Sequence, residues 1–440
     1  MNALALTGGP AVAADLETLS GSWPRVENSE AETLLRDVLK SGRWGRLHSN
    51  SYAEQFETAF AAFQQAYHGV AVANGTVSLQ LILRVLNIGI GDEVIVPALT
   101  FIATASAVAE VGAIPIFADV HPETMTIDVD SAAAAITPRT RAIIGVHYGG
   151  FPIDFDRLLP LTRQHGIHLI EDAAHAQGTE WRGTRVGALG VFGSFSFQES
   201  KSLPSGEGGI ILTNDDKLAD RARLLHHIGR RMDRPGYMHY ALASNYRLTD
   251  LQAALLLTQF KRLPEQVRRR DQAGRMLDAA LTETGILLPQ LRDERVTQRG
   301  YYFAIYRYQA KKLDGLPRAA FLAALNAEGV PASAGYGEPV YRYPAFSPEA
   351  LQMSPLRGLP NLPRYDHICL PITERLCAEE QVTIPHPVLL TGSDGMGLIA
   401  DSVAKIAANR DELRAWWRAQ EAGNHLPGGT PVETPVSVRS

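Results

Sequence analysis

Four short motifs carry side chains that could do chemistry, and the most suggestive is "FSFQESKSLPSGEGG", which contains Lys201. The lysine follows a short apolar run, and a glycine cluster follows the lysine. A lysine amine becomes nucleophilic when burial or a neighbouring charge lowers its pKa. The glycines do not match a phosphate-loop pattern and are better suited to a tight turn. By itself the motif also fits an ordinary exposed lysine at the end of a strand.

The second motif, "LIEDAAHAQG", places Asp172 after an apolar pair, at the carboxyl end of a predicted buried strand. A buried carboxylate needs a cationic or hydrogen-bonding partner. That partner could be a heterocycle nitrogen, a structural salt bridge, or a metal ion shared with His168, Glu171 and His175. A metal site is disfavoured, because His168 and Asp172 do not form a recognised ligand spacing and Glu171 should point to the opposite face of the strand.

The third motif, "VAVANGTVSLQLIL", reads as a strand, a turn and a helix from Ser78 onward. Free backbone N–H groups at a helix start attract phosphate, and Gly75 would allow a ligand to approach closely. The simpler alternative is a helix that Asn74 or Thr76 caps.

The fourth motif, "TFIATASA", begins a helix with Phe101, which could stack on a flat ligand or pack in the core. Each motif has an ordinary explanation, but the four together have a common one. A phosphate-binding turn, a stacking aromatic, a carboxylate for a ring nitrogen and a lysine for an aldehyde are the parts that bind pyridoxal 5′-phosphate. We therefore expect this cofactor.

The elements that must position these motifs alternate as short strands and helices from about residue 52 to residue 260. The predicted strands include "EVIVPA", "IPIFADV", "RAIIGVHY" and "IHLIEDAA". This alternation of strands and helices predicts an α/β fold, in which helices cover both faces of a mostly parallel sheet. Ligands bind such sheets at the carboxyl ends of the strands, where the motifs lie.

The chain length of 440 residues predicts more than one domain. We expect an N-terminal segment over 1–50 that packs on the core, a large domain over 51–285, a small domain over 286–420 and a flexible tail over 421–440. The helical pattern over 248–285 is interrupted near Pro264 and would connect the two domains. "GMGLIADSVAKIAANRDELRAWWRAQEAG" predicts one last long helix.

Composition narrows the functional classes. The net charge is −5, which argues against a general nucleic-acid binder. The chain has 2 cysteines, too few for a disulfide framework or a four-cysteine zinc site. The N-terminus has no signal-peptide pattern, and no apolar run is long enough to span a membrane. We expect a cytoplasmic protein that binds small molecules, without a metal ion.

The motifs in combination resemble those of the DegT/StrS-type sugar aminotransferases, a branch of the fold-type-I pyridoxal-phosphate enzymes. The resemblance extends from about Gly8 to Trp417 and rests on "NGTVSLQL", "VIVPALTFIATASAV", "IEDAAHAQG", "FSFQESKSLPSGEGG" and "SNYRLTDLQAALL". It implies a large domain with a mostly parallel sheet of the seven-stranded type and a smaller C-terminal α+β domain.

The resemblance also implies roles for individual residues around the cofactor. Lys201 would form the Schiff base, and Asp172 would pair with the pyridine nitrogen. Gly75, Thr76 and Ser196 would hold the phosphate.

Other residues of the implied site lie further from the reacting atoms. Phe101 would stack on the cofactor ring, and Gln177 would lie near its phenolic oxygen or its face. Asn245 would reach the phosphate from a neighbouring subunit. The resemblance therefore implies a homodimer with shared active sites.

The segments "SFQ", "GYGEPVYRYPAF" and "CAEEQVTIPHPVLL" resemble the branch that acts on cyclitols, aminohydroxybenzoate precursors or unlinked keto sugars. Tyr336, Tyr341 and His386 would then line the substrate pocket, although both tyrosines could equally pack a loop and His386 could be a satisfied buried histidine. Two residues differ from those common in the family: Ser202 follows the lysine, and Ala243 precedes "SNYR". Both make the assignment to a subfamily less definite.

The expected reaction is transfer of an amino group from L-glutamate or L-glutamine to a ketone on a sugar or cyclitol ring, in amino-sugar, aminocyclitol or antibiotic biosynthesis. Arg247 or another cation would hold the donor carboxylate. Related dehydratases carry histidine at the position of Lys201, so lysine favours transamination. The alternatives are a dehydrating synthase of the aminohydroxybenzoate type and a non-catalytic partner subunit that binds the cofactor.

Overall fold

A seven-stranded sheet forms the centre of the larger part of the computed structural model, which describes residues 3–25, 28–231, 233–234 and 237–423. The strands are β1 (His68–Val72), β2 (Glu93–Pro97), β3 (Ile114–Ala118), β4 (Thr140–Val146), β5 (His168–Asp172), β8 (Phe192–Ser196) and β9 (Gly209–Thr213). Their order is β1-β9-β8-β5-β4-β2-β3. β9 runs antiparallel to both neighbours, while the other adjacent strands are parallel. The mostly parallel sheet predicted from the sequence is confirmed.

Helices cover both faces of this sheet, because successive side chains of each buried strand point to opposite sides. In β2, Ile95 enters one apolar cluster while Val94 and Val96 enter another. The first cluster takes side chains from α3 (Tyr52–Phe63), α6 (Val129–Ala134), α7 (Phe155–His165) and α9 (Asp250–Phe260). The second takes them from α4 (Gly75–Val85), α5 (Ala103–Glu110) and α8 (Asp216–His226).

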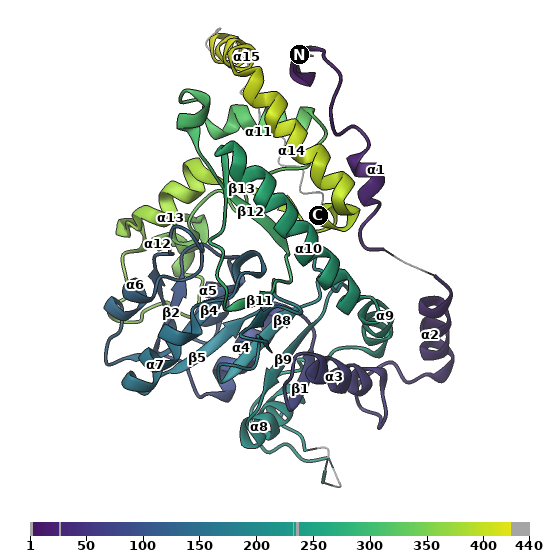
Figure 1. Ribbon diagram of the computed structural model, residues 1–440. Coiled ribbons are helices and arrows are strands. Elements are labelled where there is room, and N and C mark those ends of the chain that lie inside the picture. The colour runs from purple at the N-terminus through teal and green to yellow at the C-terminus, as the bar shows by residue number, and fades with distance from the viewer. Residues whose placement is uncertain (1–2, 26–27, 232, 235–236, 424–440) are drawn as a thin grey trace.

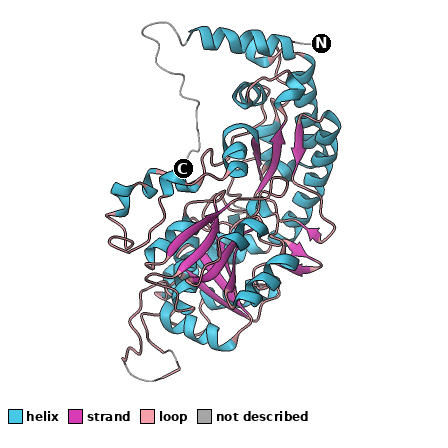
Figure 2. Cartoon of the chain, turned by 90° about the vertical axis from the view of Figure 1, so that its left-hand side faces the viewer, coloured by secondary structure: helices cyan, strands magenta, loops and turns pink. Residues whose placement is uncertain are grey.

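A second, smaller sheet lies apart from the first (Figure 2). It consists of β10 (Leu287–Pro289), β12 (Phe303–Tyr308) and β13 (Gln381–Pro385), all antiparallel. Its apolar core is shared with α11 (Arg318–Ala327), α14 (Gly392–Ala408) and α15 (Arg410–Gly423). Other elements of the described chain include α1 (Leu16–Ser20), α2 (Asn28–Ser41), β6 (Glu180–Trp181), β7 (Thr184–Arg185), β11 (Val296–Gln298), α12 (Pro348–Leu351) and α13 (Pro371–Arg375).

Helix α10 (Leu263–Thr284) joins the two parts and runs beside α14 (Figure 1). Its first turns bury Val267 in the large-sheet core, and its later turns bury Leu277 in the core of the small sheet. Leu4 and Leu16 of the N-terminal segment also pack into the small-sheet core. These contacts place α10 as the connector, while the exact domain limits stay a prediction.

Two helix limits differ from the prediction. The helix after "NGT" begins at Gly75 rather than Ser78, because the Asn74 side chain accepts the Val77 N–H at 3.0 Å and so caps an earlier turn. The predicted last helix is two helices that break at Asn409. The Asn409 side chain donates to the Lys405 carbonyl at 2.8 Å, which competes with continuation of the helix. Most of the predicted tail, 424–440, lies outside the described residues.

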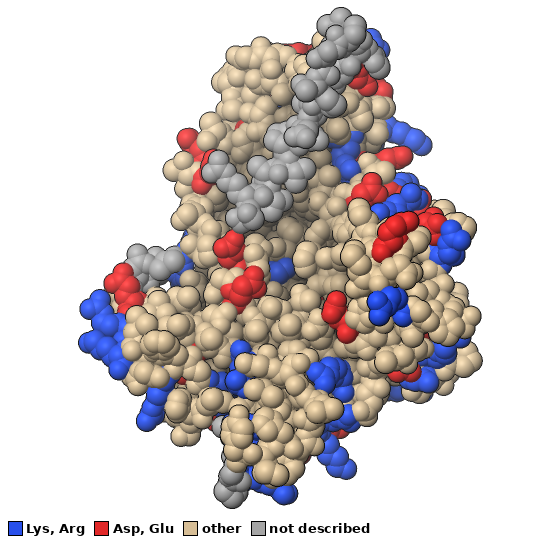
Figure 3. Space-filling view, turned by 180° about the vertical axis from the view of Figure 1, so that it is seen from behind, with Lys and Arg blue, Asp and Glu red and all other residues tan. Residues whose placement is uncertain are grey.

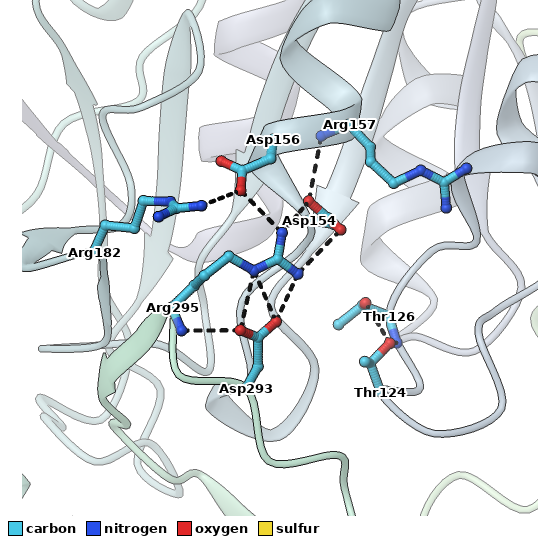
Figure 4. A network of polar contacts seen from close by, with 8 residues as sticks. All are labelled: Thr124, Thr126, Asp154, Asp156, Arg157, Arg182, Asp293 and Arg295. Atoms are coloured by element: carbon cyan, nitrogen blue, oxygen red, sulfur yellow. Dashed lines mark hydrogen bonds and ion pairs between the residues drawn. The ribbon is translucent and has the colours of Figure 1, made fainter.

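An ion-pair network on the surface ties the segment before β11 to the start of α7 (Figure 4). The Arg295 guanidinium lies 2.7 Å from Asp293, 3.2 Å from Asp154 and 3.0 Å from Asp156. It also lies 4.5 Å from the centre of the Trp181 ring. This arginine therefore fastens segments that are far apart in the sequence.

Acidic and basic side chains are both spread over the face shown in Figure 3, with wide uncharged areas between them. Among the described helices, none combines the length and the apolar character needed to cross a membrane.

Candidate active site

The chemistry-bearing motifs meet at the carboxyl ends of the parallel strands, as the sequence predicted. Asp172 ends β5 and Ser196 ends β8. The first turn of α4 faces the end of β8, because a β-carbon built on Gly75 would lie only 2.7 Å from the Ser196 β-carbon. The motifs that contain Asp172, Ser196 and Gly75 therefore share one edge of the sheet.

Gly75 and Ser196 form a narrow cradle at the start of α4. The Val77 N–H is capped by Asn74, whereas the N–H groups of Gly75 and Thr76 lie in the part of the first turn that has no partner inside a helix. Ser196 is 8% exposed, and its hydroxyl accepts the Gln198 N–H at 3.4 Å. Free amides, a hydroxyl and a helix N-terminus together favour a bound anion such as a phosphate.

Lys201 lies in the loop after β8, and its backbone is tied on both sides. Its N–H donates to the Gln198 carbonyl at 2.8 Å, and its carbonyl accepts the Trp23 indole N–H at 3.2 Å. Burial of the amine lowers the pKa of Lys201 to about 8, against the opposing effect of Asp172. A lysine with this pKa has far more free amine near neutral pH than an ordinary lysine has, and the free amine is the nucleophilic form.

Asp172 is 8% exposed and is held by neutral donors. Thr104, in the first turn of α5, donates its hydroxyl to the carboxylate at 2.8 Å, and the Ala174 N–H donates at 3.3 Å. Burial raises the pKa of Asp172, and these hydrogen bonds and Lys201 oppose the rise. The carboxylate is oriented but incompletely compensated, so it can accept a further cationic or N–H partner.

The sequence analysis placed Gln177 near the phenolic oxygen or the face of the cofactor and named His175 only as a possible metal ligand. The Gln177 amide is occupied, because it donates to the Ser196 carbonyl at 3.0 Å and accepts the Ser202 hydroxyl at 3.0 Å. His175 instead stacks on Tyr302, with ring centres 4.2 Å apart, and burial followed by Lys201 lowers the pKa of His175 well below its usual value. His175 thus lies against the Lys201 site, while Gln177 braces the strand end beneath it.

Phe101 begins an aromatic wall beside the strand ends. Its side chain is 53% exposed, and its ring centre lies 6.2 Å from that of Tyr336. Tyr336 lies 5.9 Å from Tyr148, which in turn lies 6.1 Å from His175. The wall joins Phe101 and Tyr336 to the neighbourhood of Lys201, as a pocket for a flat or ring-shaped ligand requires.

Two predicted substrate residues have contacts that account for them without a substrate. Tyr341 is 2% exposed, packs in the core beside Phe117 and donates its hydroxyl to Glu374 at 2.7 Å. His386 is also 2% exposed, and its Nε2 hydrogen-bonds the Ser200 carbonyl at 3.0 Å. These contacts favour the packing alternative for Tyr341 and the buried-histidine alternative for His386, which braces the Lys201 loop.

Asn245 and Arg247 lie together on the segment that leads from α8 to α9. Asn245 is exposed, and its side-chain oxygen accepts the Arg247 N–H at 3.2 Å. The Arg247 guanidinium donates to Nδ1 of His227 at 2.9 Å, and burial lowers the pKa of Arg247. The same segment pairs with the end of β1, where Val72 bridges Arg247 and the Ala73 N–H donates to the Tyr246 carbonyl at 2.8 Å.

Glu171 does not serve as a metal ligand in this arrangement. Its carboxylate accepts the backbone N–H groups of Gly187, Leu189 and Gly190 and pairs with His147 at 3.0 Å. Across the described part of the chain, no group of three or more side chains has the arrangement to bind a metal ion. Glu171 instead holds the turn before β8 in place.

Sequence reasoning missed Thr104, Tyr302 and Trp23. Thr104 could have been suspected from its helical spacing after Phe101. Tyr302 and Trp23 come from the small-domain side and from the N-terminal segment, and neither has a local motif that signals a contact with Lys201.

Comparisons with known proteins agree with this geometry. Residues 26–388 match the family model of the DegT/DnrJ/EryC1/StrS aminotransferases. The chain is 38% identical over 403 residues, 89% of this chain and 95% of the relative, to a putative L-glutamine:3-amino-2,3-dideoxy-scyllo-inosose aminotransferase of Streptoalloteichus tenebrarius. It is 37% identical over 430 residues, 94% of this chain and 100% of the relative, to an L-glutamine:2-deoxy-scyllo-inosose aminotransferase of Micromonospora echinospora.

A solved structure of 3-amino-5-hydroxybenzoic acid synthase is similar throughout, with a TM-score of 0.78 and 35% identity over 88% of this chain and 98% of that chain. The resemblance inferred from the motifs is thus confirmed over nearly the whole length. This chain belongs to the DegT/DnrJ/EryC1/StrS aminotransferase family and is an aminotransferase.

Proposed function

We propose that the chain binds pyridoxal 5′-phosphate through Lys201 and transfers an amino group from L-glutamine or L-glutamate to a ketone on a cyclitol or sugar ring. The observation that carries this proposal is the half-buried Lys201 side chain, whose pKa is influenced by Asp172, at the edge of the sheet where Gly75 meets Ser196. Glutamine as the donor and a keto-inosose as the acceptor are suggested by the names of the relatives.

The residues at this edge fit the proposed cofactor. The cradle of Gly75, Thr76 and Ser196 suits a phosphate, and the under-compensated carboxylate of Asp172 suits a protonated ring nitrogen. The exposed face of Phe101 suits a flat ring. When bound, the cofactor would supply an electron sink for the carbanion that forms at the donor Cα.

The chain's own part in the reaction would be proton movement and orientation. Lys201 Nζ takes the Cα proton of the amino donor as a base and returns a proton as an acid. A pKa of about 8 suits both steps, because a proton carrier works best when its pKa is close to the operating pH. Asp172, fixed by Thr104, keeps the ring nitrogen charged.

The acceptor would rest on the aromatic wall that contains Phe101, Tyr336 and Tyr148. The ring centre of Tyr336 lies 6.2 Å from that of Phe101 and 5.9 Å from that of Tyr148. A wall of phenol groups suits the faces and hydroxyls of an uncharged ring better than a nucleotide diphosphate, which calls for Arg or Lys. This observation favours a cyclitol or an unlinked sugar as the acceptor.

The active form would be a homodimer in which Asn245 of one subunit reaches the phosphate site of the other. Support comes from the segment between α8 and α9, where Asn245 lies among exposed apolar side chains. Tyr237 is 76% exposed and Leu242 is 96% exposed, which is unusual for large apolar residues that stay in water.

The test is an assay of amino transfer by the full chain supplied with pyridoxal 5′-phosphate, L-glutamine and either 3-amino-2,3-dideoxy-scyllo-inosose or a nucleotide-linked keto sugar. We expect an aminated cyclitol by mass spectrometry, and none from Lys201→Ala. Loss of water with an aromatic product would instead indicate a synthase of the aminohydroxybenzoate type. Cofactor binding without turnover on any ketone would indicate a non-catalytic partner subunit.

A further inference from the structure

Tyr302 presents the face of its ring to the reactive amine. Lys201 Nζ lies 4.1 Å from the centre of the Tyr302 ring, within the range of a cation–π contact. Tyr302 directly precedes β12, a strand of the small sheet, whereas Lys201 lies in the loop after β8, a strand of the large sheet. The contact therefore joins the lysine to the other part of the molecule.

The ring is fixed from three directions. It stacks on the His175 ring, with ring centres 4.2 Å apart and an interplanar angle of 28°. The Tyr302 hydroxyl hydrogen-bonds the Ser200 hydroxyl at 2.7 Å. The backbone carbonyl of Tyr302 accepts the His386 backbone N–H at 3.2 Å. Tyr302 is 8% exposed, so it has little freedom to turn away from the lysine. Its position is built into the fold rather than adopted by a flexible side chain.

The groups around the Lys201 amine influence whether it is protonated. Asp172 favours the ammonium form of Lys201, whereas burial disfavours it. His175 and His386 are both buried, and burial lowers the pKa of each well below its usual value, so neither is a base that competes at neutral pH. A π face beside the amine adds attraction for the ammonium form without adding a charge.

We propose that Tyr302 is a positioning residue for the proposed reaction: its ring face holds the Lys201 amine whenever that amine is not covalently linked, and it favours the protonated form. The inference rests on the proposed function, in which Lys201 alternates between a covalent link and a free proton carrier. The held amine stays beside the carboxyl edge of the sheet and keeps a proton to return.

The test measures the ionisation of Lys201 directly in the full chain without cofactor. Acetic anhydride is applied over a range of pH, and acetylation of the Lys201 peptide is followed by mass spectrometry. We compare the natural chain with Tyr302→Leu, which removes the π face, and Tyr302→Phe, which keeps the face and loses the bond to Ser200. Lys217, an exposed lysine on α8, is the internal control in the same digest.

In Tyr302→Leu we expect the pH midpoint of Lys201 labelling to fall by about one unit, which is the scale of a desolvated cation–π contact. In Tyr302→Phe and at Lys217 the midpoint should stay within about a third of a unit of the natural value. A change in access alone would alter the plateau rate and leave the midpoint unmoved. If Tyr302→Leu does not fold by circular dichroism, Tyr302→Met takes its place with the same expectation.

The proposal is overturned if the leucine and methionine variants keep the natural midpoint, or if the phenylalanine variant shifts as far as they do. This failure is distinct from a failure of the proposed function, because the labelling needs neither cofactor nor substrate. A chain that fails the labelling test but transfers amino groups keeps its function and loses only the role of Tyr302.

Discussion

Replacement of Gly75 by alanine tests the phosphate cradle. The new β-carbon would lie 2.7 Å from the Ser196 β-carbon and 3.2 Å from its hydroxyl oxygen, whereas ordinary contacts begin at 3.4 Å. The first turn of α4 and the end of β8 must therefore separate by about 0.7 Å. Overpacking of this kind costs about 1–3 kcal/mol, and the better helix propensity of alanine returns up to about 1 kcal/mol. We expect a folded protein that is destabilised by at most about 2 kcal/mol.

Binding of the phosphate should suffer more than folding does. A separation of this size breaks or lengthens a charge-assisted hydrogen bond, which is worth about 1.5–3 kcal/mol. The affinity for pyridoxal 5′-phosphate should therefore fall about tenfold to hundredfold. Pyridoxal has no phosphate, so its affinity should change little.

The assay is a fluorescence titration of Gly75→Ala with both compounds. Gly397→Ala is the matched control, because Gly397 is a helical glycine in α14 with open space around its β-position. That variant should bind both compounds normally. The reasoning is refuted if Gly75→Ala binds pyridoxal 5′-phosphate as tightly as the natural chain does, or if it loses pyridoxal to the same degree.

Three further predictions concern the charged groups. Lys201→Met should stabilise the cofactor-free chain below pH 8 by roughly 3 kcal/mol in urea unfolding, because burial lowers the pKa of Lys201 to about 8 and the natural chain is penalised wherever the amine is protonated. The gain should shrink as the pH rises toward the unfolded pKa of about 10.4. Asp172→Asn can still accept the Thr104 hydroxyl but loses the charge, so cofactor should remain bound while kcat falls at least about tenfold; an unchanged kcat in steady-state assays would contradict the role of Asp172. Arg295→Ala should destabilise the chain by about 1 kcal/mol in calorimetry, and Arg295→Lys should recover only part of this, because the Arg295 fork serves carboxylates on either side of it; full recovery by lysine would show that charge alone matters.

The sequence predicted the large sheet because its strands are apolar runs between helical patterns, a local signal that survives folding. It also singled out Asp172, which ends such a strand, and Lys201, which lies in the loop five residues after another. The start of α4 was misjudged by one turn, because capping by Asn74 competes with the apolar periodicity. The break at Asn409 was missed for a similar reason: one side-chain hydrogen bond interrupts a continuous helical pattern.

The rest of the site depends on contacts between distant segments. Tyr302 reaches Lys201 from across the junction of the two sheets, and Trp23 reaches it from the N-terminal segment. His175 and Gln177 share one motif, and only the turn after β5 determines which of them faces the lysine. Sequence pattern reports which residues end a strand, but it does not report which partners meet there.

Covalent attachment of pyridoxal 5′-phosphate to Lys201 can be tested directly. The full chain is loaded with the cofactor, reduced with borohydride, digested and examined by mass spectrometry. We expect the mass of the reduced cofactor on the peptide that contains Lys201 and on no other lysine peptide, with loss of the visible absorbance. Attachment at a different lysine, or no attachment in a chain that still transfers amino groups, would contradict it.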